Sequence, residues 1–288
     1  MPPDLGRLPI MRIDARGLTF DVRAGGPEDG PAVLLLHGFP QHAGEWDEVV
    51  PALHAAGLRT YALDQRGYSP GARPADVAAY RVPELVADTT AVLDALGVDA
   101  AHVVGHDWGA VVAWGLAAQH PARVRTLTAV SVPHPAAFVY ALNHDVRQKA
   151  RSSYMALFRQ PGGKAEKVLL ALNAVALRRM LSGVGDATRV ARYADPMREP
   201  GALTGALNWY RAMSGADLKA VGPVPVPTTY VWSDRDTAIG RTAAEACAAH
   251  VPGDYRFVEL TDVSHWIPDE APAALAEAIL ARVGTEES

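Results

Sequence analysis

Residues 103–110 read Val103-Val104-Gly105-His106-Asp107-Trp108-Gly109-Ala110, the end of an apolar run, a glycine-flanked acid and the start of a helix-forming segment. This order predicts a strand, a tight turn and a helix, with Asp107 at the corner and its side chain projecting above a sheet. A carboxylate is ionised at neutral pH, so it can attack an electrophilic carbon without a base and form an ester. Taken alone, the stretch is also consistent with an ordinary tight turn whose aspartate is solvated.

A second candidate site segment follows the apolar run Ala32–Leu36, which is typical of a strand buried on both faces of a mostly parallel sheet. The run leads into His37-Gly38-Phe39-Pro40, at the sheet edge where open α/β sheets bind ligands. We expect the backbone N–H groups of Phe39 and Trp108 to stabilise an oxyanion. We also expect His37, Phe39, Pro40 and Trp108 to border the substrate, with His37 acting mainly as a structural hydrogen-bonding residue rather than as a base.

The apolar patterns predict an α/β fold with eight strands in a mostly parallel sheet flanked by helices. The expected strands are Met11–Ile13, Leu18–Val22, Ala32–Leu36, Arg59–Leu63, Ala101–Val104, Arg125–Val130, Thr228–Trp232 and Tyr255–Leu260. The expected helices around them are Glu45–Ala56, Leu85–Leu96, Trp108–Gln119 and Ala273–Val283.

Strand patterns are absent from about His134 to Val221, where helical spacing dominates. The expected helices in this block are Phe138–Phe158, Lys164–Leu181, Asp186–Ala194 and Ala202–Met213. A helical block between two sheet-forming segments predicts a helical lid, or cap domain, inserted after a strand. We therefore expect a core domain made of residues 1–133 and 222–288 and a cap domain made of residues 134–221.

Three polar side chains follow three different expected strands, in the order Asp107, Asp236 and His265. This is the nucleophile, acid, histidine order of one hydrolase architecture, in which the acid orients the histidine and the histidine activates water. Asp236 is favoured over Asp234 as the acid, because Asp236 lies two residues farther beyond the end of the expected strand Thr228–Trp232. In the polar turn Asp64–Ser69 we expect the aspartate to pair with Arg66 and hold the loop near the site.

Composition excludes several function classes. The 288 residues carry 27 Lys and Arg against 32 Asp and Glu, a formal net charge of −5, with no basic run that would bind nucleic acid or a membrane surface. No segment is long and apolar enough to span a bilayer, and Met1–Arg12 lacks the apolar stretch of a signal peptide. Cys247 is the single cysteine. We expect a cytoplasmic protein with neither a cofactor nor a metal.

Nearly the whole chain resembles the epoxide hydrolases of the α/β-hydrolase fold. The segment His37-Gly38-Phe39-Pro40 matches the oxyanion motif of that family, and Gly105-His106-Asp107-Trp108-Gly109 matches its nucleophile elbow. The resemblance implies that a small-molecule epoxide and water form a vicinal diol through a covalent aspartyl ester. It does not indicate which epoxide is the substrate, which enantiomer is preferred or what the oligomeric state is.

The family also has two cap tyrosines that donate a proton to the epoxide oxygen as the ring opens. Tyr154, a short distance before Pro161-Gly162, fits the first, and Tyr210, within Leu207–Arg211, matches the second. A phenol suits this task because its pKa of about 10 keeps it protonated at rest while it can still share the proton with an alkoxide. Packing is the alternative role for either tyrosine.

Two other functions remain as alternatives. Haloalkane dehalogenases also have an aspartate elbow, but Phe39 offers no side-chain N–H to a halide and Tyr154 and Tyr210 would be idle. Fluoroacetate-type dehalogenases have an arginine next to the nucleophile, where this chain has Trp108. A non-catalytic ligand receptor of the same fold is the alternative of another class, although it would have no need for the nucleophile, acid and histidine together.

Overall fold

Eight strands form one sheet in the computed structural model, which describes residues 8–284. The strand order is β1-β2-β4-β3-β5-β6-β7-β8; β1 and β2 run antiparallel to their neighbours and the rest are parallel. The strands are β1 Ile10–Ala15, β2 Leu18–Gly25, β3 Ala32–Leu36, β4 Arg59–Leu63, β5 Ala101–His106, β6 Val124–Val130, β7 Thr228–Ser233 and β8 Tyr255–Leu260. All eight expected strands are therefore confirmed, with ends that differ by up to three residues.

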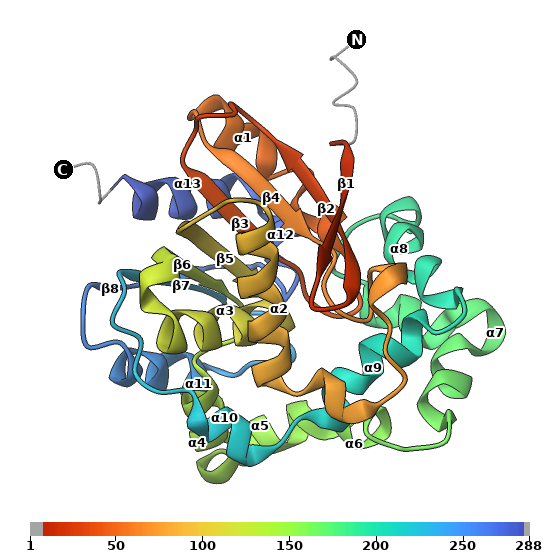
Figure 1. Cartoon of the computed structure of the whole chain (residues 1–288). Coiled ribbons are helices and arrows are strands. Elements are labelled where there is room, and N and C mark those ends of the chain that lie inside the picture. Colours follow the sequence, from red (N-terminus) through yellow and green to blue (C-terminus); the bar gives the residue numbers. More distant parts are fainter. Residues whose placement is uncertain (1–7, 285–288) are drawn as a thin grey trace.

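Helices cover both faces of the sheet (Figure 1). On one face lie α1 and α13, and on the other α2 and α3. The helices outside the insertion are α1 Val50–Ala55, α2 Val82–Ala95, α3 Trp108–Gln119, α11 Arg241–Glu245, α12 Ile267–Glu270 and α13 Pro272–Val283. A mostly parallel sheet needs such cover because both of its faces are apolar.

The apolar side chains of the central strand β3 pack against the helices on both faces of the sheet. Leu34 and Leu36 belong to the cluster that includes α2 and α3, whereas Val33 and Leu35 belong to the cluster that includes α1 and α13. All four side chains are fully buried. Because successive side chains in a strand point to opposite faces, a continuous apolar run is what a strand between two helical layers requires.

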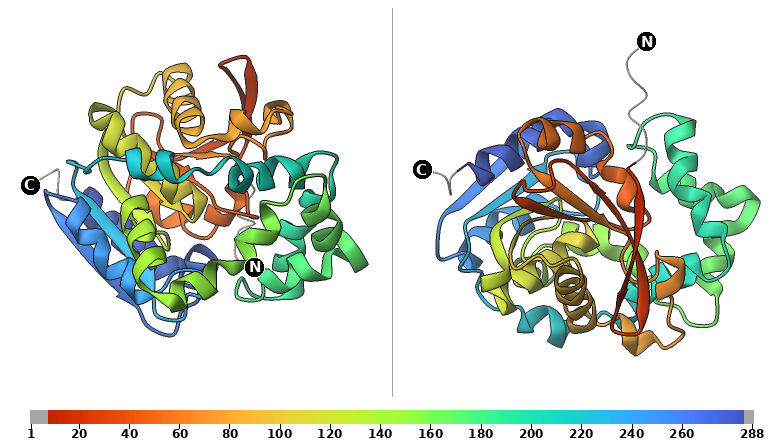
Figure 2. Two further views of the ribbon diagram at one scale, coloured as in Figure 1. Left: turned by 90° about the horizontal axis from the view of Figure 1, so that it is seen from below. Right: turned by 45° about the horizontal axis from the view of Figure 1, so that its top comes forward.

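The chain between β6 and β7 forms an inserted helical cap, coloured from green to cyan along the lower and right sides of Figure 1. Figure 2 shows the same helices grouped at one end of the sheet. Its helices are α4 Pro135–His144, α5 Val146–Arg151, α6 Met155–Phe158, α7 Lys164–Met180, α8 Ala187–Ala194, α9 Ala202–Ala212 and α10 Gly215–Ala220.

Three expected helices are broken, which corrects the sequence-based prediction. The expected helix Lys164–Leu181 is kinked, because residues 171–174 leave helical backbone angles and three of them have positive φ. The segment Phe138–Phe158 is divided because Asp145 has an extended backbone and its side chain accepts a hydrogen bond from the Arg147 N–H, so it ends α4 and caps α5. A 3₁₀ turn, Ser152–Tyr154, then precedes α6. The expected helix Glu45–Ala56 is likewise split into a 3₁₀ turn, Ala43–Trp46, and α1.

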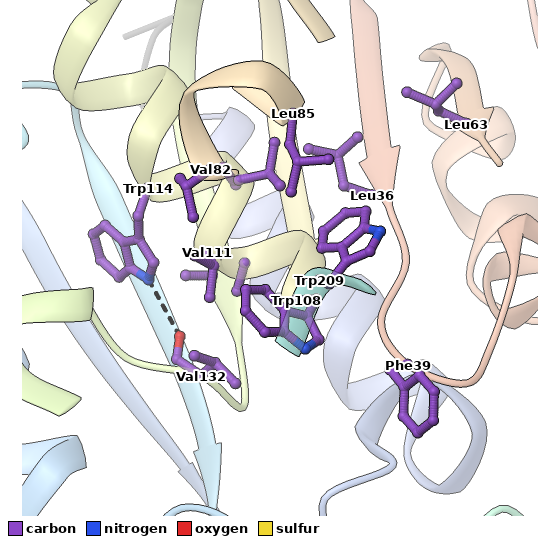
Figure 3. Packing of buried hydrophobic residues seen from close by; sticks show 14 of the residues in the cluster. Leu36, Phe39, Leu63, Val82, Leu85, Trp108, Val111, Trp114, Val132 and Trp209 are labelled. Carbon is purple, nitrogen blue, oxygen red and sulfur yellow. Dashed lines mark hydrogen bonds between the residues drawn. The ribbon is translucent and has the colours of Figure 1, made fainter. Parts of the chain in front are cut away.

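The cap and the core share one apolar cluster. Trp209 of α9 packs edge-on against Trp108 at a ring-centroid distance of 5.6 Å, and its Nε1–H donates to the Arg66 carbonyl oxygen at 2.8 Å. Figure 3 shows the two indole rings side by side below the N-terminal residues of α2. The Arg66 side chain pairs with Asp88 of α2 at 2.5 Å and not with Asp64, contrary to the sequence-based expectation.

Candidate active site

The turn after β5 places Asp107 in a strained conformation. Its φ of 49° and ψ of −118° lie in a region that side chains rarely adopt, and α3 begins at the next residue. The turn is possible because neighbouring backbones come very close: a Cβ atom at Gly109 would collide with the Leu36 carbonyl oxygen, and one at Gly38 would collide with Asp107. Glycines at these positions therefore bring the Phe39 loop against the carboxylate.

The two oxygens of Asp107 have different partners. Oδ1 accepts a hydrogen bond from the Phe39 backbone N–H at 2.8 Å, and Oδ2 lies 3.4 Å from Nε2 of His265. Burial acts to raise the pKa of Asp107, but the hydrogen bond and positive charge of His265 outweigh it, so the pKa is lowered. The carboxylate is thus held ionised. A second oxyanion donor, the Trp108 N–H at the start of α3, stays a prediction.

His265 bridges two carboxylates. Its Nδ1 lies 2.7 Å from Oδ2 of Asp236, while Oδ1 of Asp236 accepts from the backbone N–H groups of Ala238 and Ile239 at 2.7 and 2.8 Å. Burial would lower the pKa of His265, but the charges of Asp236 and Asp107 raise it to about 10. Asp234, the alternative acid, is exposed and accepts a hydrogen bond from the Asp262 N–H instead.

Two cavities meet at Asp107, Tyr154 and Tyr210, which line both. The smaller, of about 50 Å³, has mainly apolar walls, and the larger, of about 290 Å³, also reaches His265. The tyrosine ring centroids are 6.3 Å apart. Burial, followed by the negative charge of Asp107, raises the pKa of Tyr154, and burial also raises that of Tyr210. Both phenols are therefore protonated, as a proton donor must be.

Two of the four predicted substrate-contacting residues lie away from these cavities. Phe39 lines the larger cavity and Trp108 the smaller, but neither His37 nor Pro40 is among the described residues that line them. His37 is fully buried, and its Nε2 accepts from the Gln65 N–H at 3.1 Å. Burial lowers the pKa of His37 to about 4, which keeps this nitrogen free to accept. Its Nδ1 lies 3.0 Å from the Gly38 carbonyl oxygen, so the ring connects the loop that carries Phe39 to the backbone of Gln65.

Sequence reasoning missed the groups that hold the backbone of His265. The His265 carbonyl oxygen accepts from Ser131 Oγ at 2.8 Å and lies 3.0 Å from Nε2 of His106. If Nε2–H donates there, Nδ1 of His106 must accept, and it faces Oε2 of Glu45 at 3.3 Å. Burial raises the pKa of Glu45 well above its usual value and lowers that of His106 to about 4, so a protonated Glu45 facing a neutral His106 satisfies the contact. The position of His106 within the elbow segment was the only sequence signal for this role.

Residues 8–284 contain no group of three or more His, Cys, Asp or Glu side chains arranged to hold a metal ion. The same residues include no helix with the length and apolar character needed to cross a membrane.

Comparisons with known proteins identify the fold family and the relatives of this chain. The alpha/beta hydrolase fold family matches residues 31–272. AB hydrolase superfamily protein YfhM of Bacillus subtilis is 34% identical over 93% of this chain and 95% of its own length, and Epoxide hydrolase A of Mycobacterium tuberculosis is 32% identical over 93% and 95%. The crystal structure of Epoxide Hydrolase A from Mycobacterium thermoresistibile superposes with a TM-score of 0.83 at 26% identity, covering 96% of this chain and 98% of the other. The chain belongs to the epoxide hydrolase family of the α/β-hydrolase fold.

Proposed function

We propose that this chain hydrolyses an epoxide to a vicinal diol through a covalent ester on Asp107. The observation that carries the proposal is the junction of the two cavities, where an ionised carboxylate and two protonated phenols line the same space. The names of the relatives support the same substrate class. Phenols distinguish this reaction from halide displacement, because a departing halide needs no proton donor.

In the first step, Oδ2 of Asp107 attacks a ring carbon, a carbon–oxygen ester bond forms, and the ring carbon–oxygen bond breaks. The electron pair of the broken bond stays on the epoxide oxygen, which takes a proton from Tyr154 or Tyr210. The Phe39 N–H holds Oδ1, so Oδ2 is the oxygen that remains available to react. Ring opening thus consumes the negative charge of Asp107 and leaves one tyrosine deprotonated.

In the second step, water attacks the carbonyl carbon of the ester. The charge of Asp107 has disappeared, so the pKa of His265 falls from its raised value. The imidazolium passes its proton to the deprotonated tyrosine and can then act as the base. The tetrahedral oxyanion forms where the Phe39 N–H already points. As the ester bond breaks, one proton of the water stays on His265 and the other goes to the departing alkoxide, which completes the diol and restores the Asp107 carboxylate.

Isotope labelling tests the covalent intermediate. A single turnover in heavy-oxygen water should place a labelled oxygen in the Asp107 carboxylate, because water attacks the enzyme-derived carbonyl carbon. Mass spectrometry of the peptide that contains Asp107 measures the label. Label found only in the diol would mean direct attack of water on the epoxide, and the proposed ester would be wrong.

Substitution of His265 tests the division of the two steps. His265→Gln should form the ester but not hydrolyse it, so intact-protein mass spectrometry should reveal an adduct with the mass of the epoxide. His144→Gln, in an exposed part of α4, is the matched control and should turn over normally. A folded, inactive and unmodified His265→Gln protein would contradict the assignment of His265 as the base for ester hydrolysis. A parent protein that converts haloalkanes but no epoxide would favour the dehalogenase alternative.

A further inference from the structure

Arg151, the last residue of α5, lines the larger cavity although its side chain is exposed. Its Nη1–H donates to the backbone carbonyl oxygen of Asp236 at 2.5 Å. A residue that both faces solvent and lines a cavity marks a place where that cavity reaches the surface. The guanidinium group therefore lies beside the backbone of Asp236, at an exposed part of the cavity that Asp107 also lines.

The charge of Arg151 is not neutralised by the protein. Some other cap arginines are paired with carboxylates, as Arg178 is with Asp195 and Arg211 with Glu166. In contrast, no Asp or Glu oxygen among residues 8–284 lies within 4.0 Å of the Arg151 guanidinium. A guanidinium has five N–H donors in a planar fork that matches a carboxylate. Its one bond to a peptide oxygen leaves most of this capacity available.

The other charged groups at the larger cavity already have partners. Asp107 and His265 face one another, and His265 also contacts Asp236. The rest of the lining is apolar or uncharged, including Phe39, Met180, Trp266 and Thr237. A carboxylate brought into this space would be costly to desolvate unless it met a cation. Arg151 is the cation in the lining that has no carboxylate of its own.

We propose that the substrate is an epoxide whose larger substituent carries a carboxylate, which Arg151 binds at the outer end of the larger cavity. This inference rests on the proposed epoxide hydrolysis. The ring lies between Asp107 and the two tyrosines, the acidic chain extends past His265 to Arg151, and the other substituent enters the smaller cavity. At about 50 Å³ and with mainly apolar walls, that cavity accepts only a short apolar group.

The experiment compares epoxy acids with their methyl esters. The substrates carry a methyl group on one ring carbon and a carboxyalkyl chain of increasing length on the other. The parent protein should prefer the acid over the ester in kcat/KM by about tenfold at the best chain length. This is the low end of the range for hydrogen bonds to charged groups, because Arg151 is exposed. The preference should shrink at high salt.

Arg151→Gln should abolish the preference for the acid, and Arg151→Lys should retain part of it. The ratio of acid to ester is the readout because Arg151 also contacts Asp236, and any effect on the catalytic groups affects both substrates equally. Arg147→Gln removes the same charge one turn earlier on the exposed surface of α5 and should leave the ratio unchanged.

The outcomes separate this inference from the proposed function. Equal kcat/KM for epoxide opening in the epoxy acid and in its methyl ester would overturn the inference and leave epoxide hydrolysis in place. A preference for the acid that survives in Arg151→Gln would do the same. Failure of the parent protein to open any of these epoxides, esters included, would overturn both. A preference that Arg147→Gln reduces as much as Arg151→Gln would mean that the general charge of the cap, and not Arg151, attracts the acid.

Discussion

At the level of single residues, His265 can act as a general base only when its imidazole has lost a proton. The charges of Asp236 and Asp107 raise the pKa of His265 to about 10, so the imidazole is protonated at neutral pH and cannot serve as a base. In the proposed mechanism, formation of the ester removes one of the two carboxylate charges. The proposed first step would therefore produce the base that the second step needs.

The two half-reactions should consequently depend on pH in different ways. The pKa of Asp107 is lowered, so the alkylation rate should be flat through the neutral range and fall only in acid, where the carboxylate becomes protonated. Hydrolysis of the ester should speed up as pH rises, with an apparent pKa below 10, because His265 must lose its proton. Stopped-flow single turnovers at a series of pH values measure both rates. A hydrolysis rate that falls with rising pH would contradict the role of His265.

A pair of aspartates tests which carboxylate orients His265. In Asp236→Asn, the amide oxygen can still accept from the Ala238 and Ile239 N–H groups, but the charge that faces Nδ1 is lost. Ester hydrolysis should slow by roughly 10²- to 10⁴-fold, the scale of general-base catalysis. Asp234→Asn should leave this rate unchanged, since Asp234 is exposed and contacts the Asp262 N–H. The reverse pattern would assign the acid to Asp234.

At the level of elements, the two proposed proton donors come from separate parts of the cap. Tyr154 ends the 3₁₀ turn Ser152–Tyr154, and Tyr210 lies on α9. Edge-on contacts hold the Tyr210 ring against Phe39 and Trp108, at centroid distances of 5.3 and 5.2 Å. Because these neighbours are the predicted oxyanion donors, the packing that orients the phenol also locates it relative to Asp107.

Removing the hydroxyl groups one at a time measures their contribution. Tyr154→Phe and Tyr210→Phe keep the ring contacts, so each should fold normally and lower the alkylation rate on the scale of general-acid catalysis, roughly 10²- to 10⁴-fold. The double variant should lose nearly all activity, because the alkoxide then has no donor. Tyr140→Phe, half exposed on α4 and stacked on His144, is the control and should have no effect. Parental rates in both single variants would make the tyrosines packing residues.

At the level of the whole molecule, we propose that residues 1–133 and 222–288 form the core domain and residues 134–221 the cap; the outermost residues of the core range lie outside the described part of the chain. Buried side chains from both ranges belong to a single cluster, in which Trp209 of the cap contacts Trp108 of the core. The proposed active site lies at this contact. Its geometry therefore depends on the two parts staying packed together.

Trp209 tests that dependence through stability. Its side chain is almost completely buried, so Trp209→Ala should lower the free energy of unfolding by about 3–5 kcal/mol, as is usual for removal of a buried aromatic ring. Leu172→Ala, at a position on α7 that is 85% exposed, should change it by less than about 0.5 kcal/mol. Denaturant unfolding followed by circular dichroism measures both variants. Equal effects of the two substitutions would mean that the Trp209 contact does not stabilise the fold.

The sequence by itself determined the features that depend on neighbouring residues and on chain order. The apolar run Ala32–Leu36 predicted a strand buried on both faces, and the glycines around Asp107 predicted the turn that carries it. The order Asp107, Asp236, His265 further predicted which side chains could meet at one sheet edge. Strand periodicity, turn chemistry and connection order are short-range properties, so a sequence expresses them directly.

Only the tertiary structure decided which partners the polar side chains find. Arg66 pairs with Asp88, 22 residues away in the sequence, and not with Asp64, which is only two residues away. Arg151 donates to the backbone carbonyl of Asp236, 85 residues away in the sequence. The hydrogen bonds of Ser131 and His106 to the His265 carbonyl likewise join distant segments. Packing of the cap and the sheet brings these groups together, and a polar group that is buried must bond to whatever donor or acceptor the packing places beside it.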